Sequence, residues 1–181
     1  MTGNRSALLI SCAALFFSTA ASAHRLDEYL QATTINVTRH HISLQLRLTP
    51  GVDVAPSVMR QIDQNNDGQF SMAEQQAYRA RLLQSLTLTM NGKAVALSAS
   101  SMTFPPPQSI QKGTGVIDLQ LNATAELKAG TYTLVYHNRG MGAETAWLVN
   151  CLVPQDPDIH VVQQTRSADQ SRYTLQLAIA S

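Results

Sequence analysis

Most of the chain alternates between apolar and polar residues with a period of two. In 41–48 (HISLQLRL), every second residue from position 42 onward is apolar and the residues between them are polar. The preceding stretch 31–38 (QATTINVT) alternates in the same way. This period is typical of a strand with one buried face. The short link Arg39-His40 predicts a hairpin between the two strands.

Further strands are predicted along the rest of the chain. Asn91-Gly92 separates SLTLTM from KAVAL and suits a two-residue type I′ hairpin turn. The stretch 145–153 (TAWLVNCLV) is apolar on both faces, which favours a central strand. Other alternating stretches cover 116–126, 131–137, 159–165 and 172–180. The prolines of 104–109 (FPPPQS) indicate a loop or an edge crossing. About nine strands at these spacings predict a β-sandwich.

Residues 52–84 break the pattern and change to helical spacing. Ser71 is followed three residues later by Glu74, which is the capping-box signature of a helix start. We therefore expect a helical insertion between the second and third strands. The residues expected to face inward are Val58, Met59, Ile62, Ala77, Leu82 and Leu83.

Residues 63–74 (DQNNDGQFSMAE), inside this insertion, fit a twelve-residue EF-hand calcium loop. Such a loop needs oxygen ligands at positions 1, 3, 5, 9 and 12, a backbone carbonyl at 7 and glycine at 6. Phe70, at position 8, is expected to anchor the loop to the core. The predicted ligands are Asp63, Asn65, Asp67, Gln69 through its carbonyl, Ser71 directly or through water, and Glu74 through both carboxylate oxygens.

The chemistry of the loop favours calcium, a hard cation that takes many oxygen ligands at flexible geometry. Gly68 permits the left-handed turn that folds both halves of the loop around an ion. The sequence shows no second loop, and Asn65 is neutral, so the affinity is expected to be modest, about 10⁻⁵ to 10⁻³ M. This favours a structural calcium site over a sensor. The alternative is an acidic loop that has kept its shape and lost its ion.

A secretory signal peptide is predicted at residues 1–23. Arg5 supplies the positive start, and the apolar run 7–17 is too short to span a membrane. Ala21-Ser22-Ala23 supplies small residues before the cleavage point. The mature chain would be one domain, 24–181, in the periplasm or outside the cell.

Charge and cysteine content add little chemistry. Without Arg5, 12 basic and 12 acidic residues remain, which gives no footprint for nucleic acid. No later segment is apolar enough to be a transmembrane helix. Cys12 lies in the predicted signal, where a lipoprotein box is the weaker interpretation. Cys151 is then unpaired, and we expect it to be a buried core thiol because it shares the parity of Trp147, Val149 and Val153.

Cleavage after Ala23 would give His24 a free α-amine. An N-terminal histidine can bind copper or nickel, and a second histidine could complete the site. The candidates for that second ligand are His40, His41, His137 and His160. His41 and His137 have the parity of solvent-facing strand positions, which favours ordinary surface histidines.

Nothing in the sequence indicates an enzyme. Asp156 and Asp158 could be paired carboxylates, but Pro157 between them favours a turn. No nucleophile elbow, zinc-protease motif or phosphate loop is present.

Several stretches resemble known families. The loop and its flanking helices resemble the EF-hand calcium-binding family, and LKAGTYTLVYHN resembles an immunoglobulin-like E–F corner. AHRLDEYLQA, RLTPGV and LVNCLVP-DP resemble exported bacterial proteins of unknown function that are similar to the periplasmic part of HupE/UreJ-type membrane proteins. That resemblance implies a link to nickel supply. Unlike the membrane-bound members, this chain shows no spanning segment before Ser181.

We therefore expect a mainly β, immunoglobulin-like β-sandwich with an inserted EF-hand helix–loop–helix at about 52–84. The expected function is that of a calcium-binding periplasmic accessory or binding protein, with a membrane protein as a candidate partner. The alternative is a copper- or nickel-binding carrier that serves a membrane metal transporter.

Overall fold

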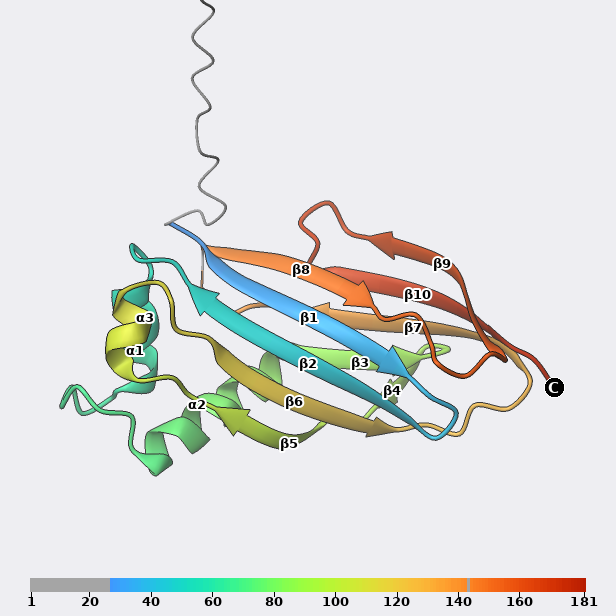
Figure 1. Ribbon diagram of the computed structural model, residues 1–181, viewed down its shortest axis with the longest axis horizontal. Coiled ribbons are helices and arrows are strands. Elements are labelled where there is room, and N and C mark those ends of the chain that lie inside the picture. The colour runs from blue at the N-terminus through green and yellow to red at the C-terminus, as the bar shows by residue number, and fades with distance from the viewer. Residues whose placement is uncertain (1–26, 143) are drawn as a thin grey trace, which may run out of the picture.

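The computed structural model describes residues 27–142 and 144–181, which form two β-sheets packed face to face with helices at one end (Figure 1). Sheet A has the order β5-β6-β2-β1-β8 and sheet B the order β4-β3-β7-β10-β9. The strands are β1 (Tyr29–Val37), β2 (His41–Pro50), β3 (Leu86–Met90), β4 (Lys93–Val95), β5 (Ser98–Thr103), β6 (Ile117–Thr124), β7 (Gly130–Asn138), β8 (Thr145–Cys151), β9 (Ile159–Arg166) and β10 (Arg172–Ile179). The helices are α1 (Ala55–Ile62), α2 (Met72–Ser85) and α3 (Pro107–Gln111). The predicted mainly β architecture with two stacked sheets is confirmed.

The core lies between the sheets and is built from the alternating positions. Ile42, Leu44, Leu46 and Leu48 of β2 are at most 1% exposed. Each such side chain contributes roughly 1.5–3 kcal/mol when it is fully buried. β1 and β2 pair antiparallel across the Arg39-His40 link, so the first predicted hairpin is confirmed.

The second predicted hairpin is also confirmed. β3 and β4 pair antiparallel across Asn91 and Gly92, which have φ angles of 50° and 77°. Positive φ at both central positions is the mark of a type I′ turn. The Asn91 side chain extends the turn to β7, because its Oδ1 accepts a hydrogen bond of 2.8 Å from the Thr133 backbone N–H.

Two elements were not predicted. β5 (SASSMT) pairs with β6 at the edge of sheet A, although it carries little apolar alternation. α3 begins at Pro107, the last of the three prolines in the stretch that was predicted as a loop or edge crossing, and it buries Ile110 completely.

The prediction of a central strand at 145–153 was wrong. β8 pairs in parallel with β1 and forms the edge of sheet A among the described strands. Leu148 and Val153 are 42% and 80% exposed. Cys151 is only partly buried, contrary to the expected core thiol, because sheet A ends at this strand.

The helical insertion lies between β2 and β3, as predicted, at one end of the sandwich (Figure 1). Val58, Ile62 and Leu82 are buried as expected, whereas Met59, Ala77 and Leu83 are only half-buried. Tyr78 takes the central inward position of α2 instead. Its hydroxyl lies 2.6 Å from the Tyr29 hydroxyl of β1, and both rings are buried. This contact joins the insertion to sheet A.

A tyrosine also fixes the turn between β6 and β7. The Tyr132 hydroxyl accepts a hydrogen bond of 3.0 Å from the Lys128 backbone N–H and donates one of 3.2 Å to the Lys128 carbonyl. The turn residues Ala125 and Leu127 are buried beneath it and bond to the carbonyls of the β1–β2 link.

Candidate metal centre

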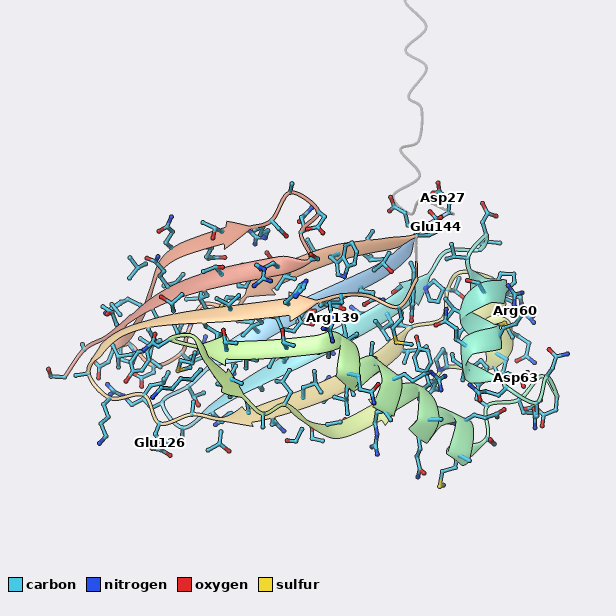
Figure 2. All side chains as sticks on the ribbon, turned by 180° about the vertical axis from the view of Figure 1, so that it is seen from behind. Asp27, Arg60, Asp63, Glu126, Arg139 and Glu144 are labelled. Atoms are coloured by element: carbon cyan, nitrogen blue, oxygen red, sulfur yellow. The ribbon has the colours of Figure 1, made fainter. Side chains whose placement is uncertain are left out.

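The loop 63–74 connects the end of α1 to the first turn of α2. Asp63 is the C-cap of α1, and Figure 2 shows it at the helical end of the molecule. Gly68 has a φ of +78° and Asn66 a φ of +59°, so the chain makes two left-handed residues within the loop. A side chain at Gly68 would meet no neighbour, so the backbone angle is what favours glycine here. These angles turn the second half of the loop back toward the first.

The first predicted ligand, Asp63, points into the loop. Asp63 is 7% exposed. Its Oδ1 accepts a hydrogen bond of 3.1 Å from the Asp67 N–H, and its Oδ2 accepts one of 2.8 Å from the Gly68 N–H. Asp67 and Gly68 are positions 5 and 6 of the loop, so Asp63 sets the curvature on which the other ligand positions depend.

The last predicted ligand, Glu74, reaches across the loop from the opposite end. Its Oε1 accepts hydrogen bonds of 2.8 and 3.3 Å from the N–H groups of Gln64 and Asn65. Its Oε2 accepts from the Ser71 N–H at 2.9 Å and the Ser71 hydroxyl at 2.7 Å. The predicted capping box is therefore confirmed. These bonds, that from the Ser71 hydroxyl above all, lower the pKa of Glu74 to about 2 and keep it ionised.

The remaining predicted ligands lie along the exposed arc of the loop. The Asn65 side chain accepts from the Asp67 N–H at 3.0 Å and donates to Asp67 Oδ2 at 2.9 Å. Asp67 Oδ1 also accepts from the Gln69 N–H at 2.8 Å. Gln69 and Ser71 are exposed. The loop thus gathers its polar side chains around its own backbone.

Phe70 ties the loop to the body of the protein, as its position predicts. Its ring lies edge-on to Phe104, with centroids 6.2 Å apart, and Phe104 lies edge-on to Tyr78 at 6.0 Å. Arg81 of α2 adds a polar tie, because its Nη2 donates to the Gln61 carbonyl at the end of α1. Tyr78 and Arg81 were not singled out from the sequence, and their partners lie in distant segments.

The predicted ligands suit a hard cation, although their carboxylates accept hydrogen bonds from backbone N–H groups in this structure. Within 27–142 and 144–181, no three histidine, cysteine, aspartate or glutamate side chains form a group that could hold a metal ion. Asp63, Asp67 and Glu74 instead accept loop N–H groups. All the predicted ligand atoms are oxygens, and the two carboxylates at the ends of the loop are both turned into it. Oxygen ligands in this arrangement suit calcium better than a transition metal.

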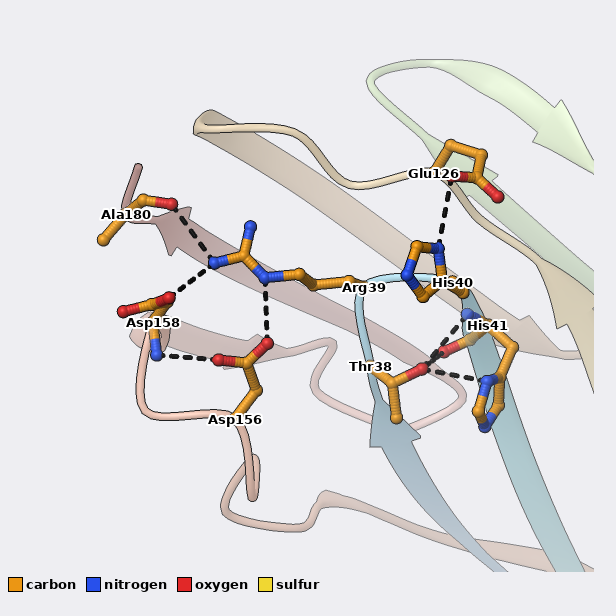
Figure 3. A network of polar contacts seen from close by, with 8 residues as sticks. All are labelled: Thr38, Arg39, His40, His41, Glu126, Asp156, Asp158 and Ala180. Carbon is orange, nitrogen blue, oxygen red and sulfur yellow. Dashed lines mark hydrogen bonds and ion pairs between the residues drawn. The ribbon is translucent and has the colours of Figure 1, made fainter.

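The described histidines are spread over the surface. His40 Nδ1 lies 3.3 Å from Glu126 Oε2, and His41 Nδ1 lies 2.9 Å from Thr38 Oγ1, both at the β1–β2 link (Figure 3). His137 is half-buried on β7, and burial together with the neighbouring arginines lowers its pKa. His160 lies exposed on β9. His24, the predicted copper or nickel ligand, lies outside the described residues, as does the predicted signal peptide.

Asp156 and Asp158 have a partner that the sequence did not suggest. Both bind the guanidinium of Arg39, at 2.9 and 2.7 Å (Figure 3). Asp156 Oδ1 also accepts from the Asp158 N–H at 2.9 Å, and this bond is the main reason that the pKa of Asp156 is lowered. The pair ties the β1–β2 link to the segment before β9, which favours a structural turn.

Comparisons with known proteins give no relative from which the fold or the loop could be interpreted. No protein-family model, curated protein or solved structure matches the chain. Within the part of the chain that the structure describes, none of the helices has the length and apolar character needed to cross a membrane.

Proposed function

We propose that this protein is an exported accessory or binding protein whose EF-hand loop, residues 63–74, holds a structural calcium ion. The observation that carries the proposal is the placement of the two terminal carboxylates. Asp63 and Glu74 enter the loop from opposite ends and bond to its backbone within two residues of each other. Gly68 supplies the left-handed turn that the loop needs between them.

The ion would be held by side-chain oxygens and one backbone carbonyl. Asp63, Asn65, Asp67, Ser71 and Glu74 supply the side-chain oxygens, and Gln69 supplies the carbonyl. Bound calcium would offset the mutual repulsion of three carboxylates. Because α1 and α2 meet at this loop, the ion would also fix the helical insertion against the sandwich through Phe70.

Calcium is expected to raise the melting temperature. A ligand that binds only the folded state at about 100 times its Kd stabilises that state by about 2.7 kcal/mol. With a Kd of about 10⁻⁴ M, 10 mM calcium meets that condition. For a chain of this size the melting temperature should rise by roughly 5–11 °C. Circular dichroism melting curves with 10 mM calcium and with chelator test this, and identical curves would contradict the proposal.

The order of the strands supports an immunoglobulin-like class for the sandwich. In sheet A, the neighbouring strands β1, β2, β6 and β5 correspond to strands A, B, E and D of an immunoglobulin-like sandwich. In sheet B, the neighbouring strands β4, β3, β7 and β10 correspond to strands C′, C, F and G. β8 and β9 come between F and G in the chain and extend both sheets at one edge. Tyr132, bonded to Lys128 before strand F, has the position of a tyrosine corner.

The proposed location and partner of this protein rest on features of its sequence. The predicted signal peptide places the loop in an extracytoplasmic calcium pool, where modest affinity suffices. The resemblance to the periplasmic part of HupE/UreJ-type proteins makes a membrane protein the candidate partner. The alternative function, a copper or nickel carrier, depends on a free amine at His24.

Copper titration separates these two functions. We expect Cu(II) to bind weakly and equally to a protein that begins at His24 and to one with an extra residue before it, because the histidines of the described residues form no group that could hold a metal ion. Absorption and electron paramagnetic resonance spectra would report the ligands. A tight site that the extra residue destroys would instead support the carrier function.

A further inference from the structure

A hollow of about 530 Å³ lies between the C-terminal ends of α1 and α2 and the turn that follows β7. Its walls include Gln61, Arg81, Gln84, Arg139 and Met141. Figure 2 shows Arg139 at the end of β7, beside the C-terminal end of α2. The hollow is separate from the calcium loop, and neither aspartate nor glutamate lines it.

Both arginines of the hollow keep unused hydrogen-bond donors. Arg81 donates through Nη2 to the Gln61 carbonyl, and Arg139 donates through Nη2 to the Gln84 carbonyl. Within the described residues, no ion pair joins either guanidinium to a carboxylate, and Nε and Nη1 of both have no polar partner. Both arginines line the hollow, and no carboxylate of the described residues is paired with either of them, although the Arg81 guanidinium also lies over the Tyr78 ring, 5.8 Å from its centre.

The structure beneath the hollow also has an excess of donors. Asn138 Oδ1 accepts from the Gly140 N–H, and Asn138 Nδ2 donates to Gln31 Oε1, each over 2.8 Å. These two bonds set the orientation of both amides, which leaves Gln31 Nε2 buried without an acceptor. Trp147 Nε1 is likewise buried without one, under Gly140, where an added Cβ would lie 2.8 Å from the indole ring. Among the described residues, the two buried side-chain groups that lack a partner are both N–H donors, and both lie near this turn.

We propose that this hollow is a binding site for an oxyanion, a carboxylate or phosphate group, held by Arg81 and Arg139. Planar guanidinium groups match the paired oxygens of such groups, and charge-assisted bonds of this kind are the strong ones. Gln84 adds a carboxamide to the lining, whereas Gln61 Nε2 already donates to the Met141 carbonyl at 3.3 Å. The hollow is shallow and open to solvent, so a small organic acid or a phosphate ester could reach both arginines.

A purely structural role for the two arginines is the competing explanation. A cation at a helix C-terminus bonds to the last carbonyls and complements the helix dipole, and both arginines do this. That role uses one nitrogen of each guanidinium and requires no affinity for anions. The two explanations therefore differ in whether the protein binds an anion saturably.

Isothermal titration with inorganic phosphate and with succinate, in calcium-free buffer of constant ionic strength, distinguishes the two roles. We expect saturable binding at one site, and we expect Arg139→Gln to weaken it about tenfold. Arg139 is exposed, so this variant should lower the melting temperature only slightly, through the lost bond to the Gln84 carbonyl. Arg79→Gln is the matched control, since Arg79 lies on α2 outside the hollow and should leave the affinity unchanged.

A second variant guards against loss of structure. Arg81→Lys keeps a cation at the end of α1 but removes the planar fork, and it should also weaken binding. Stronger binding of phosphate than of succinate would identify a phosphate ligand, and the reverse order a carboxylate ligand. The proposal is overturned if neither anion binds saturably, or if Arg139→Gln binds as tightly as Arg79→Gln.

Discussion

Glu74→Gln is expected to abolish most of the calcium-dependent rise in melting temperature. Calcium favours a bidentate carboxylate at position 12 of the loop, and an amide offers one neutral oxygen in its place. The loss should be close to the whole calcium effect, about 2.7 kcal/mol at 100 times the Kd. The melting temperature in chelator should also fall, because glutamine keeps one oxygen for the capping box with Ser71 but loses the second oxygen, which accepts from the Gln64 and Asn65 N–H groups. The diagnostic quantity is therefore the difference between the melting temperatures with and without calcium.

Glu126→Gln is the matched control for this experiment. Glu126 is an exposed carboxylate whose side chain contacts His40, far along the chain from the loop. The same change of acid to amide there should leave the full calcium effect in place. If Glu74→Gln and Glu126→Gln respond equally to calcium, the ion does not bind through Glu74.

Tyr78→Ala should destabilise the protein by about 3–5 kcal/mol, as truncation of a large buried aromatic residue does. Tyr78 is fully buried, lies edge-on to Phe104 and meets the Tyr29 hydroxyl at 2.6 Å. Burial raises the pKa of Tyr78 to about 12, so both hydroxyl groups stay protonated at neutral pH. Equilibrium unfolding in urea would measure the loss.

The hydroxyl contact can be separated from the ring by Tyr78→Phe. This variant should cost about 1–2 kcal/mol, because it leaves the buried Tyr29 hydroxyl without its partner. Adding Tyr29→Phe should recover part of that loss, because no unpaired hydroxyl then remains. If Tyr78→Phe has no effect alone, the hydroxyl pair does not help to join α2 to sheet A.

The features that the sequence predicted well are those governed by local rules. The alternation of 41–48, the Asn91-Gly92 turn and the Ser71–Glu74 capping box depend on residues a few positions apart, and all three are present. The calcium loop was likewise predicted from one run of twelve consecutive residues, six of which are the predicted ligands. Both the EF-hand assignment of this loop and its calcium ion remain proposals.

The features that were missed depend on distant neighbours. β8 was predicted as a central strand because both its faces are apolar. The structure shows that it pairs with one strand, β1, among the described residues, and so lies at the edge of sheet A. β5 has too little apolar alternation to be recognised, and its pairing with β6 defines it. The α2 face was misjudged by one position, since Tyr78 and not Ala77 meets Tyr29, which lies 49 residues away in the chain.

The polar interior also escaped prediction. Gln31 and Thr33 point inward on β1, where the alternation would lead one to expect apolar residues, and both are buried. They are tolerated because Gln31 bonds to Asn138 and Thr33 to Tyr136, on the opposite sheet. Such pairs cannot be predicted from one strand. A buried polar group is stable only when it has a hydrogen-bond partner, and here the partner lies on another sheet.

Direct calcium titration tests the central claim most plainly. Isothermal titration of the chelator-treated protein should show one calcium ion bound per chain, with a Kd between about 10⁻⁵ and 10⁻³ M, and no such site in Glu74→Gln. Saturable binding with this stoichiometry is the result we predict. No saturable calcium binding up to about 10 mM, well above the expected Kd, would contradict it.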